Sequence, residues 1–150
     1  MSVTLTIDGR EVTVPDGTTV WDAAKSAGID IPVLCHDPRF DPVGVCRMCV
    51  VDVGARVYAA SCVRKAEPGM KVDASSATVV KHRKVLTELL LSDHGSPCAK
   101  EKTTADCALE ALGRGFGIGA AAFASANGRP ADVTNPAIAV DHQACIRCGR

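Results

Sequence analysis

Aromatic side chains are scarce in this sequence, at 3% of its residues, and neither sign of charge is in excess. Seventeen lysines and arginines balance seventeen aspartates and glutamates. Proteins that bind nucleic acids combine a basic surface with aromatic side chains that stack on bases. The composition therefore predicts that the chain has no nucleic-acid partner.

A long apolar run is also lacking, although 47% of the residues are apolar. A membrane-spanning helix needs roughly 18 consecutive apolar residues, and a secretory signal needs a basic segment followed by an apolar one. The sequence instead begins with apolar and polar residues in alternation, as at Val3, Leu5 and Ile7. We expect no transmembrane segment and a cytoplasmic location.

Eight cysteines are the most prominent feature that is present. An even number permits a disulfide framework, but such frameworks are expected in secreted chains. In a reducing compartment, clustered cysteines more often bind metal. A disulfide-stapled secreted domain is therefore the less favoured interpretation.

The apolar pattern predicts a mixed fold. Residues 3–7 and 12–14 alternate around the turn dipeptide Asp8-Gly9, which indicates a β-hairpin. A helix is expected to begin at Thr18 or Thr19 and to end at Gly28. Further strands are expected around residues 50–53, 57–60 and 70–73, then a helix from Ser75 or Ser76 to about Leu91, a short helix from about Thr104 to Leu112, and a small strand at 138–140. This order predicts an α+β roll.

Four of the cysteines follow the spacing C-x10-C-x2-C-x12-C, namely Cys35, Cys46, Cys49 and Cys62. Four thiolates suit an iron–sulfur cluster, and Gly44 permits a close approach of the backbone to inorganic sulfide. Structural zinc also binds four cysteines, but zinc ribbons usually contain two C-x2-C pairs, and this group has one. The spacing favours iron–sulfur and leaves zinc open.

Short motifs around these cysteines resemble one group of oxidoreductases. They are Val14-Pro15-Asp16-Gly17-Thr18-Thr19, Ile31-Pro32-Val33-Leu34-Cys35, Gly44-Val45-Cys46-Arg47-Met48-Cys49-Val50-Val51 and Ala60-Ser61-Cys62. They resemble the N-terminal ferredoxin-like domain of the complex I large iron–sulfur subunit, FeFe hydrogenases and NAD-dependent formate dehydrogenases. The resemblance continues to Leu91-Ser92-Asp93-His94 and so covers most of the chain. It implies a β-grasp fold and a plant-type 2Fe–2S cluster on the four cysteines.

In that family the next segment carries a 4Fe–4S cluster on one histidine and three cysteines, spaced H-x3-C-x2-C-x5-C. His94, Cys98 and Cys107 match three of these positions, and Glu101 occupies the fourth. A carboxylate is a harder ligand than a thiolate and is an uncommon partner for a cluster. A cluster with Glu101 or water on one iron, a three-iron cluster, and no cluster at all therefore remain open.

The last residues resemble the start of a bacterial-type ferredoxin module, whose pattern is C-x2-C-x2-C-x3-C. Cys145 and Cys148 match its first two cysteines, and the next one falls due one residue after the sequence ends. Two cysteines alone do not complete a 4Fe–4S site. We therefore expect a fragment of a larger subunit, without its catalytic domain.

These observations predict four segments. They are a 2Fe–2S ferredoxin-like β-grasp domain at 1–76, a helix with the one-His three-Cys-type segment at 77–113, a Gly/Ala-rich linker at 114–137, and the truncated start of a 4Fe–4S ferredoxin domain at 138–150.

The predicted function is that of the electron-relay part of a multi-cofactor oxidoreductase, most like a formate dehydrogenase or hydrogenase large subunit. Plant-type centres have potentials near about −400 mV, which suits exchange with a flavin-containing or NADH-oxidising subunit or with a ferredoxin. The rest of its own large subunit is the other expected partner. The alternatives are a fragment of a complex I-type NADH dehydrogenase subunit and a zinc-stabilised interaction module.

Overall fold

The computed structural model describes residues 1–120, 122–125, 130–142 and 145–146. The described residues divide into two compact units, one within residues 1–83 and the other beginning at Lys84. The boundary falls inside one long helix, α2 (Ala77–Asp93), which contributes to both units.

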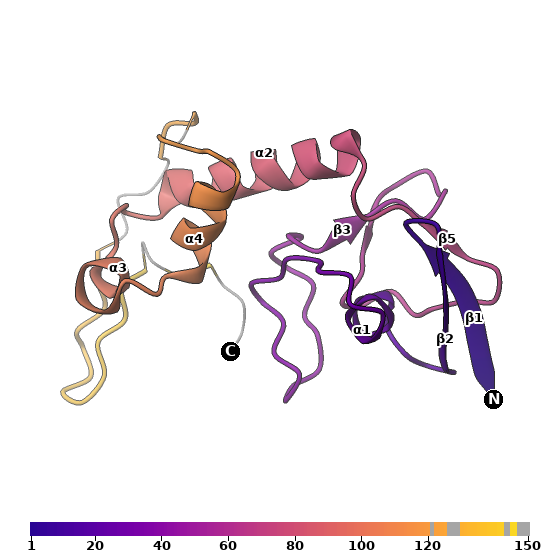
Figure 1. Ribbon diagram of the computed structural model, residues 1–150. Helices are drawn as coiled ribbons and strands as arrows, with labels where there is room; N and C mark the ends of the chain where they lie inside the picture. The colour runs from indigo at the N-terminus through magenta and orange to yellow at the C-terminus, as the bar shows by residue number, and fades with distance from the viewer. Residues whose placement is uncertain (121, 126–129, 143–144, 147–150) are drawn as a thin grey trace. The chain divides into compact units, whose positions relative to one another are not determined.

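A three-stranded mixed sheet forms one side of the first unit (Figure 1). It contains β1 (Ser2–Ile7), β2 (Arg10–Pro15) and β5 (Lys71–Val72) in the order β2-β1-β5. β1 is antiparallel to β2, with Val3 opposite Val14, and parallel to β5. Asp8 and Gly9 form the turn between β1 and β2 with φ angles of 48° and 79°, so the predicted hairpin is confirmed.

Helix α1 (Val20–Ser26) packs its apolar face into the core that the sheet lines. The Thr19 hydroxyl caps it by accepting a hydrogen bond from the Asp22 backbone N–H at 3.1 Å, as expected of an N-terminal threonine. Val20, Ala23 and Ala24 are buried, because they recur on one face of the helix. The predicted helix is therefore confirmed.

A second, two-stranded sheet consists of β3 (Val50–Val51) and β4 (Ala59–Ala60). Val50 pairs with Ala60 in antiparallel register. Asp52, just after β3, exchanges backbone hydrogen bonds of 2.9 and 2.8 Å with Asp73, just after β5. The unit is thus an α+β roll with a small mixed sheet, which confirms the β-grasp prediction.

Arg83 of helix α2 is buried and binds backbone carbonyls of two other elements. Its guanidinium donates to the Val50 carbonyl at 2.7 and 3.2 Å and to the Ala74 carbonyl at 2.8 Å. Burial lowers the pKa of Arg83, and the negative charge of Cys49 opposes that shift. The side chain joins the start of α2 to the strand that follows Cys49.

The second unit holds the rest of α2 and two short helices, α3 (Ala99–Thr104) and α4 (Ala108–Gly115). α4 matches the short helix expected at 104–112 but begins later, because Cys107 is its N-cap. α3 was not predicted. The expected strand at 138–140 is wrong, since Val140 forms only an isolated bridge with Asp132.

Within the described residues, every helix is too short or too polar to cross a lipid bilayer.

Replacing Arg83 by alanine is expected to lower the free energy of unfolding by about 2–3 kcal/mol, because buried carbonyls lose a charged donor. Chemical denaturation followed by circular dichroism measures the change. Lys84→Ala, an exposed neighbour, is the control and should change stability by less than about 0.5 kcal/mol. Equal losses in the two variants would contradict this role for Arg83.

Candidate metal centres

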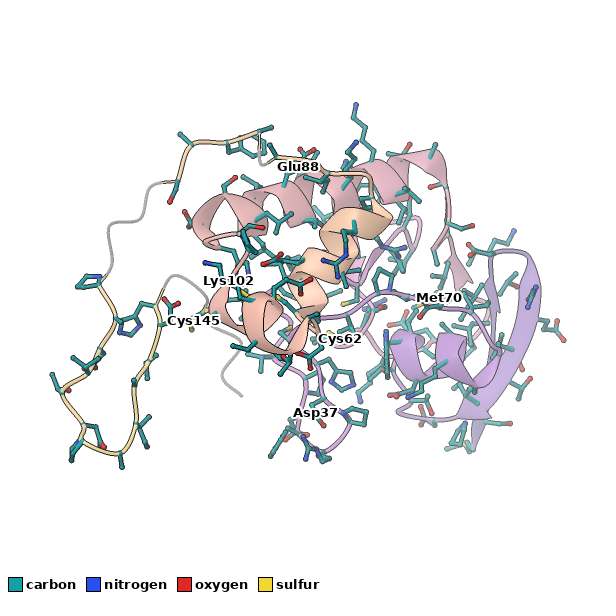
Figure 2. The ribbon with its side chains drawn as sticks, turned by 60° about the vertical axis from the view of Figure 1, so that its left-hand side comes forward. Asp37, Cys62, Met70, Glu88, Lys102 and Cys145 are labelled. Carbon is teal, nitrogen blue, oxygen red and sulfur yellow. The ribbon has the colours of Figure 1, made fainter. Side chains whose placement is uncertain are left out.

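The first unit brings the four cysteines of the C-x10-C-x2-C-x12-C pattern into its interior. Cys35 and Cys46 lie on the long loop between α1 and β3, Cys49 directly precedes β3, and Cys62 follows β4. All four are buried, and Cys49 and Cys62 are fully buried. Figure 2 labels Cys62, together with Asp37 on the loop that carries the first cysteines. The β3–β4 pairing is what brings Cys49 and Cys62, 13 residues apart, next to each other.

The sulfur atoms of Cys49 and Cys62 share a hydrogen bond at 3.3 Å. This is well beyond the S–S bond length of about 2.05 Å, and all four thiols are free. The Cys62 thiol lowers the pKa of Cys49 to about 6, and the same contact raises the pKa of Cys62. The charges of Cys35 and Cys46 also raise the pKa of Cys62, so the four sulfurs act on one another.

The loop that carries these cysteines is held in an unusual backbone conformation. Gly44 has a φ of 70° and Arg47 a φ of 56°. A Cβ atom on Gly44 would lie 2.8 Å from a methyl group of Val63, so the loop approaches the residue after Cys62 too closely for a side chain. The Arg47 guanidinium donates to the Tyr58 carbonyl at 2.9 Å and fixes the loop to the β3–β4 hairpin.

Backbone groups of the loop are directed at sulfur. Burial raises the pKa of Cys46, while hydrogen bonds from the backbone of Met48, Cys35 and Leu34 act in the opposite direction. Backbone N–H groups that stabilise thiolate also tune the potential of iron–sulfur clusters. Four buried thiols with such backbone donors therefore fit a 2Fe–2S cluster.

A second group of metal-binding side chains lies in the second unit. The ligand atoms of His94, Cys98, Cys107 and Glu110 all lie within 4.8 Å of one another, and all four residues are buried. The structure thus brings together the three residues that match the one-His three-Cys motif, as an additional 4Fe–4S site would require, and places a carboxylate beside them. Glu110 had not been singled out from the sequence.

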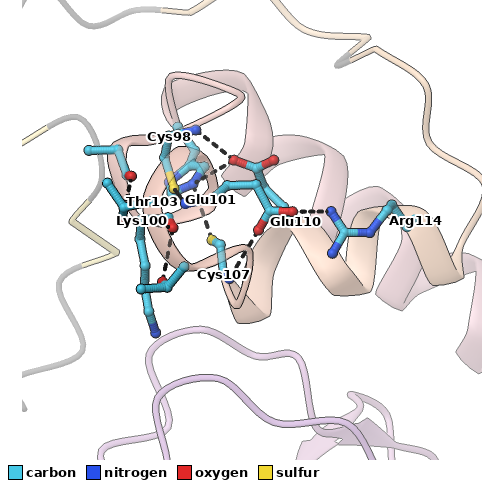
Figure 3. A network of polar contacts seen from close by, with 10 residues as sticks. Cys98, Lys100, Glu101, Thr103, Cys107, Glu110 and Arg114 are labelled. Atoms are coloured by element: carbon cyan, nitrogen blue, oxygen red, sulfur yellow. Dashed lines mark hydrogen bonds and ion pairs between the residues drawn. The ribbon is translucent and has the colours of Figure 1, made fainter.

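The two cysteines of this group occupy corresponding positions at helix starts (Figure 3), although only the Cys98 sulfur accepts a capping hydrogen bond, from the Glu101 N–H. Cys98 is the N-cap of α3 and Cys107 the N-cap of α4, and each is followed three residues later by a glutamate in the pattern Cys-Ala-x-Glu. Glu110 accepts a hydrogen bond from the Cys98 N–H at 2.7 Å, and Glu101 accepts one from the Cys107 N–H at 3.1 Å. The repeated pattern is the sequence signal that would have identified Glu110.

The two glutamates nevertheless differ in their surroundings. Glu101 forms an ion pair with Arg114 at 2.6 Å, outside the group of four. Glu110 lies 3.6 Å from the His94 ring, and the Cys98 N–H holds the pKa of this carboxyl below its ordinary value. Glu101, which stands at the middle cysteine position of the H-x3-C-x2-C-x5-C motif, therefore turns to Arg114.

Of the third cysteine pair, Cys145 is exposed, and Cys148 lies outside the described residues.

The α+β fold and its four buried thiols define a ferredoxin-like domain that binds an iron–sulfur cluster. A family model described as a 2Fe-2S iron-sulfur cluster binding domain matches residues 1–77. The chain belongs to this family, and its cofactor is a 2Fe–2S cluster.

Proteins similar to the chain include oxidoreductase subunits. The chain is 40% identical over 123 residues to NADP-reducing hydrogenase subunit HndD of Solidesulfovibrio fructosivorans, which covers 77% of this chain and 21% of that protein. It is 32% identical over 152 residues to the mitochondrial NADH-ubiquinone oxidoreductase 78 kDa subunit of Candida albicans, covering 99% of this chain and 21% of that protein. The chain thus spans about a fifth of the length of these curated relatives.

A solved structure shares the fold along the chain. One chain of NAD+-reducing [NiFe]-hydrogenase in its H2-reduced state has a TM-score of 0.88 and 35% sequence identity, over 99% of this chain and 64% of that one. The chain therefore corresponds to the N-terminal iron–sulfur, electron-relay region of such oxidoreductase subunits.

Replacing Gly44 by alanine is expected to destabilise the cysteine loop in two ways. The left-handed backbone costs about 1–2 kcal/mol, and the new methyl group displaces Val63 beside Cys62. Gly54→Ala is the matched control, because Gly54 has a φ of 72° with no atom near the added Cβ. Visible absorption followed in the presence of a chelator should decay at least about twofold faster for Gly44→Ala than for Gly54→Ala. Equal rates would show that the Val63 contact does not protect the site.

Proposed function

We propose that Cys35, Cys46, Cys49 and Cys62 are the four ligands of the 2Fe–2S cluster, and that the chain relays single electrons within a hydrogenase-like or formate dehydrogenase-like large subunit. The observation that carries the assignment is the convergence of four buried, free thiols, two of them 3.3 Å apart. Four thiolates are the ligand set of a plant-type centre. Thiols kept free also suit the reducing interior of the cytoplasm.

The cluster supplies a site that accepts and gives up one electron. The chain's own residues hold the cluster, exclude water from it and set the charge around it. The cysteine sulfurs would bind the irons of the cluster. The buried side chains around them, such as Met48 and Val51, exclude water. Arg83 places a positive charge near Cys49, which favours the more negative, reduced state of the centre.

The preference for a hydrogenase-like subunit is supported by the 40% identity with the NADP-reducing hydrogenase subunit and by the fold of the NAD+-reducing hydrogenase chain. The formate dehydrogenase alternative depends on the sequence motifs alone. A complex I-type subunit is the second candidate, because the 78 kDa subunit of NADH-ubiquinone oxidoreductase matches 99% of the chain. In each case the proposed electron partners are a flavin-containing or NADH-oxidising subunit or a ferredoxin, together with the remainder of the large subunit.

Replacing Cys49 by serine is expected to abolish the visible absorption of the anaerobically purified chain, because a hydroxyl is a poor substitute for a thiolate on iron. Cys145→Ser is the control, since Cys145 is exposed and outside the group of four. The control should keep its full spectrum.

Cys46→Ser repeats the test at a second proposed ligand, on the loop between α1 and β3. Far-UV circular dichroism identifies any variant that fails to fold. A folded Cys49→Ser or Cys46→Ser protein with an unchanged visible spectrum would contradict the ligand assignment.

A further inference from the structure

We propose that His94, Cys98, Cys107 and Glu110 bind a single divalent cation of the zinc class, with Glu110 as the fourth ligand. This inference concerns the second unit and goes beyond the proposed function, which depends on the 2Fe–2S site of the first.

The spacing of the ligand atoms suits one ion. In a tetrahedral zinc site with Zn–S near 2.3 Å and Zn–N near 2.0–2.1 Å, a sulfur and a nitrogen lie about 3.6 Å apart, and a nitrogen and an oxygen about 3.4 Å apart. The Cys107 sulfur lies 3.5 Å from Nε2 of His94, and a Glu110 carboxylate oxygen lies 3.6 Å from the same nitrogen. The four ligand atoms all lie within 4.8 Å of one another, so any wider pair would have to close by about 1 Å at most to reach the tetrahedral S–S separation of about 3.8 Å.

The same spacing disfavours a 4Fe–4S cluster. Such a cluster places four irons and four sulfides between its ligands, which keeps the ligand atoms farther apart than those of a single ion. It would also need a fourth soft ligand, whereas the group contains a carboxylate. Two thiolates, one imidazole and one carboxylate are all established ligands of zinc.

Among the described residues, Glu110 has no lysine or arginine as an ion-pair partner. The side chains of His94 and Glu110 are only 5% and 8% exposed. Arg114 pairs with Glu101 instead, and Nε2 of His94 faces the Cys107 sulfur and the Glu110 carboxylate. Lone pairs that converge in a buried site are costly unless a cation or a donor meets them. A divalent ion bound by Nε2, two sulfurs and one carboxylate oxygen would supply that charge.

Local structure explains why Glu110, rather than Glu101, is the ligand. Cys107 and Glu110 occupy the N-cap and third positions of α4, and side chains at these positions lie on the same side of a helix start. Glu101 has the equivalent place on α3, but its carboxylate is held by the Cys107 N–H and Arg114. Glu101 thus fixes the backbone of Cys107 but is not itself one of the four clustered residues.

The test uses the whole 150-residue chain, purified anaerobically from cells supplied with both iron and zinc. We expect one zinc per chain beside about two irons, with no further iron taken up when iron and sulfide are added. X-ray absorption at the zinc edge should report two sulfurs near about 2.3 Å and two lighter atoms near about 2.0–2.1 Å. This measurement does not detect the iron site and needs no variant.

A matched pair of isosteric variants then identifies the carboxylate. Glu110→Gln should weaken zinc binding at least about tenfold in competition with a chelator, and Glu101→Gln by less than about threefold. Both variants retain an amide oxygen for the backbone N–H that each glutamate now binds.

The proposal is overturned if the chain holds about six irons and no zinc, if it holds no metal beyond the 2Fe–2S site, or if only Glu101→Gln weakens zinc binding. Visible absorption from the first site stays unchanged in each of these outcomes. A failure here is thereby distinguished from a failure of the proposed function.

Discussion

Four sulfur atoms must be buried together in the first unit although their thiolate forms repel one another. The repulsion is visible at Cys62, whose pKa is raised by its hydrogen bond with Cys49 and by burial, and further by the negative charges of Cys49, Cys35 and Cys46. Burial makes it stronger, because charge is poorly screened away from water. Positively charged iron and backbone N–H groups relieve it. The fold therefore has to hold the sulfurs in place, and the bound metal has to stabilise the fold in return.

The elements of the first unit meet this requirement through separate contacts. The β1–β2 hairpin and α1 pack apolar side chains into one core, and Cys49 and Cys62 belong to the same core. The β3–β4 pairing then sets Cys49 beside Cys62, and Arg83 attaches this hairpin to α2. The cysteine loop has a glycine, Gly44, where a side chain would collide with Val63. A small α+β roll is thus sufficient to bring the four sulfurs together.

Much of this arrangement was predictable from local sequence. Alternation around Asp8-Gly9 predicted the hairpin, and Thr19 predicted the start of α1, because both signals act over a few residues. The cysteine spacing predicted a shared site before any distance was known. Helix α3 was missed because its residues, from Ala99 to Thr104, are almost all polar and show no apolar period. Glu110 was missed for a different reason. It stands outside the one-His three-Cys motif, its partner Cys98 is 12 residues away, and only the repeated Cys-Ala-x-Glu pattern marks it in the sequence.

The most direct test of the central claim combines electron paramagnetic resonance with metal and sulfide analysis on the anaerobically purified chain. The account predicts about two irons and two acid-labile sulfides bound in the first unit, and one unpaired spin per chain after reduction with dithionite. A chain that stays without signal on reduction and carries zinc in place of that iron would contradict it.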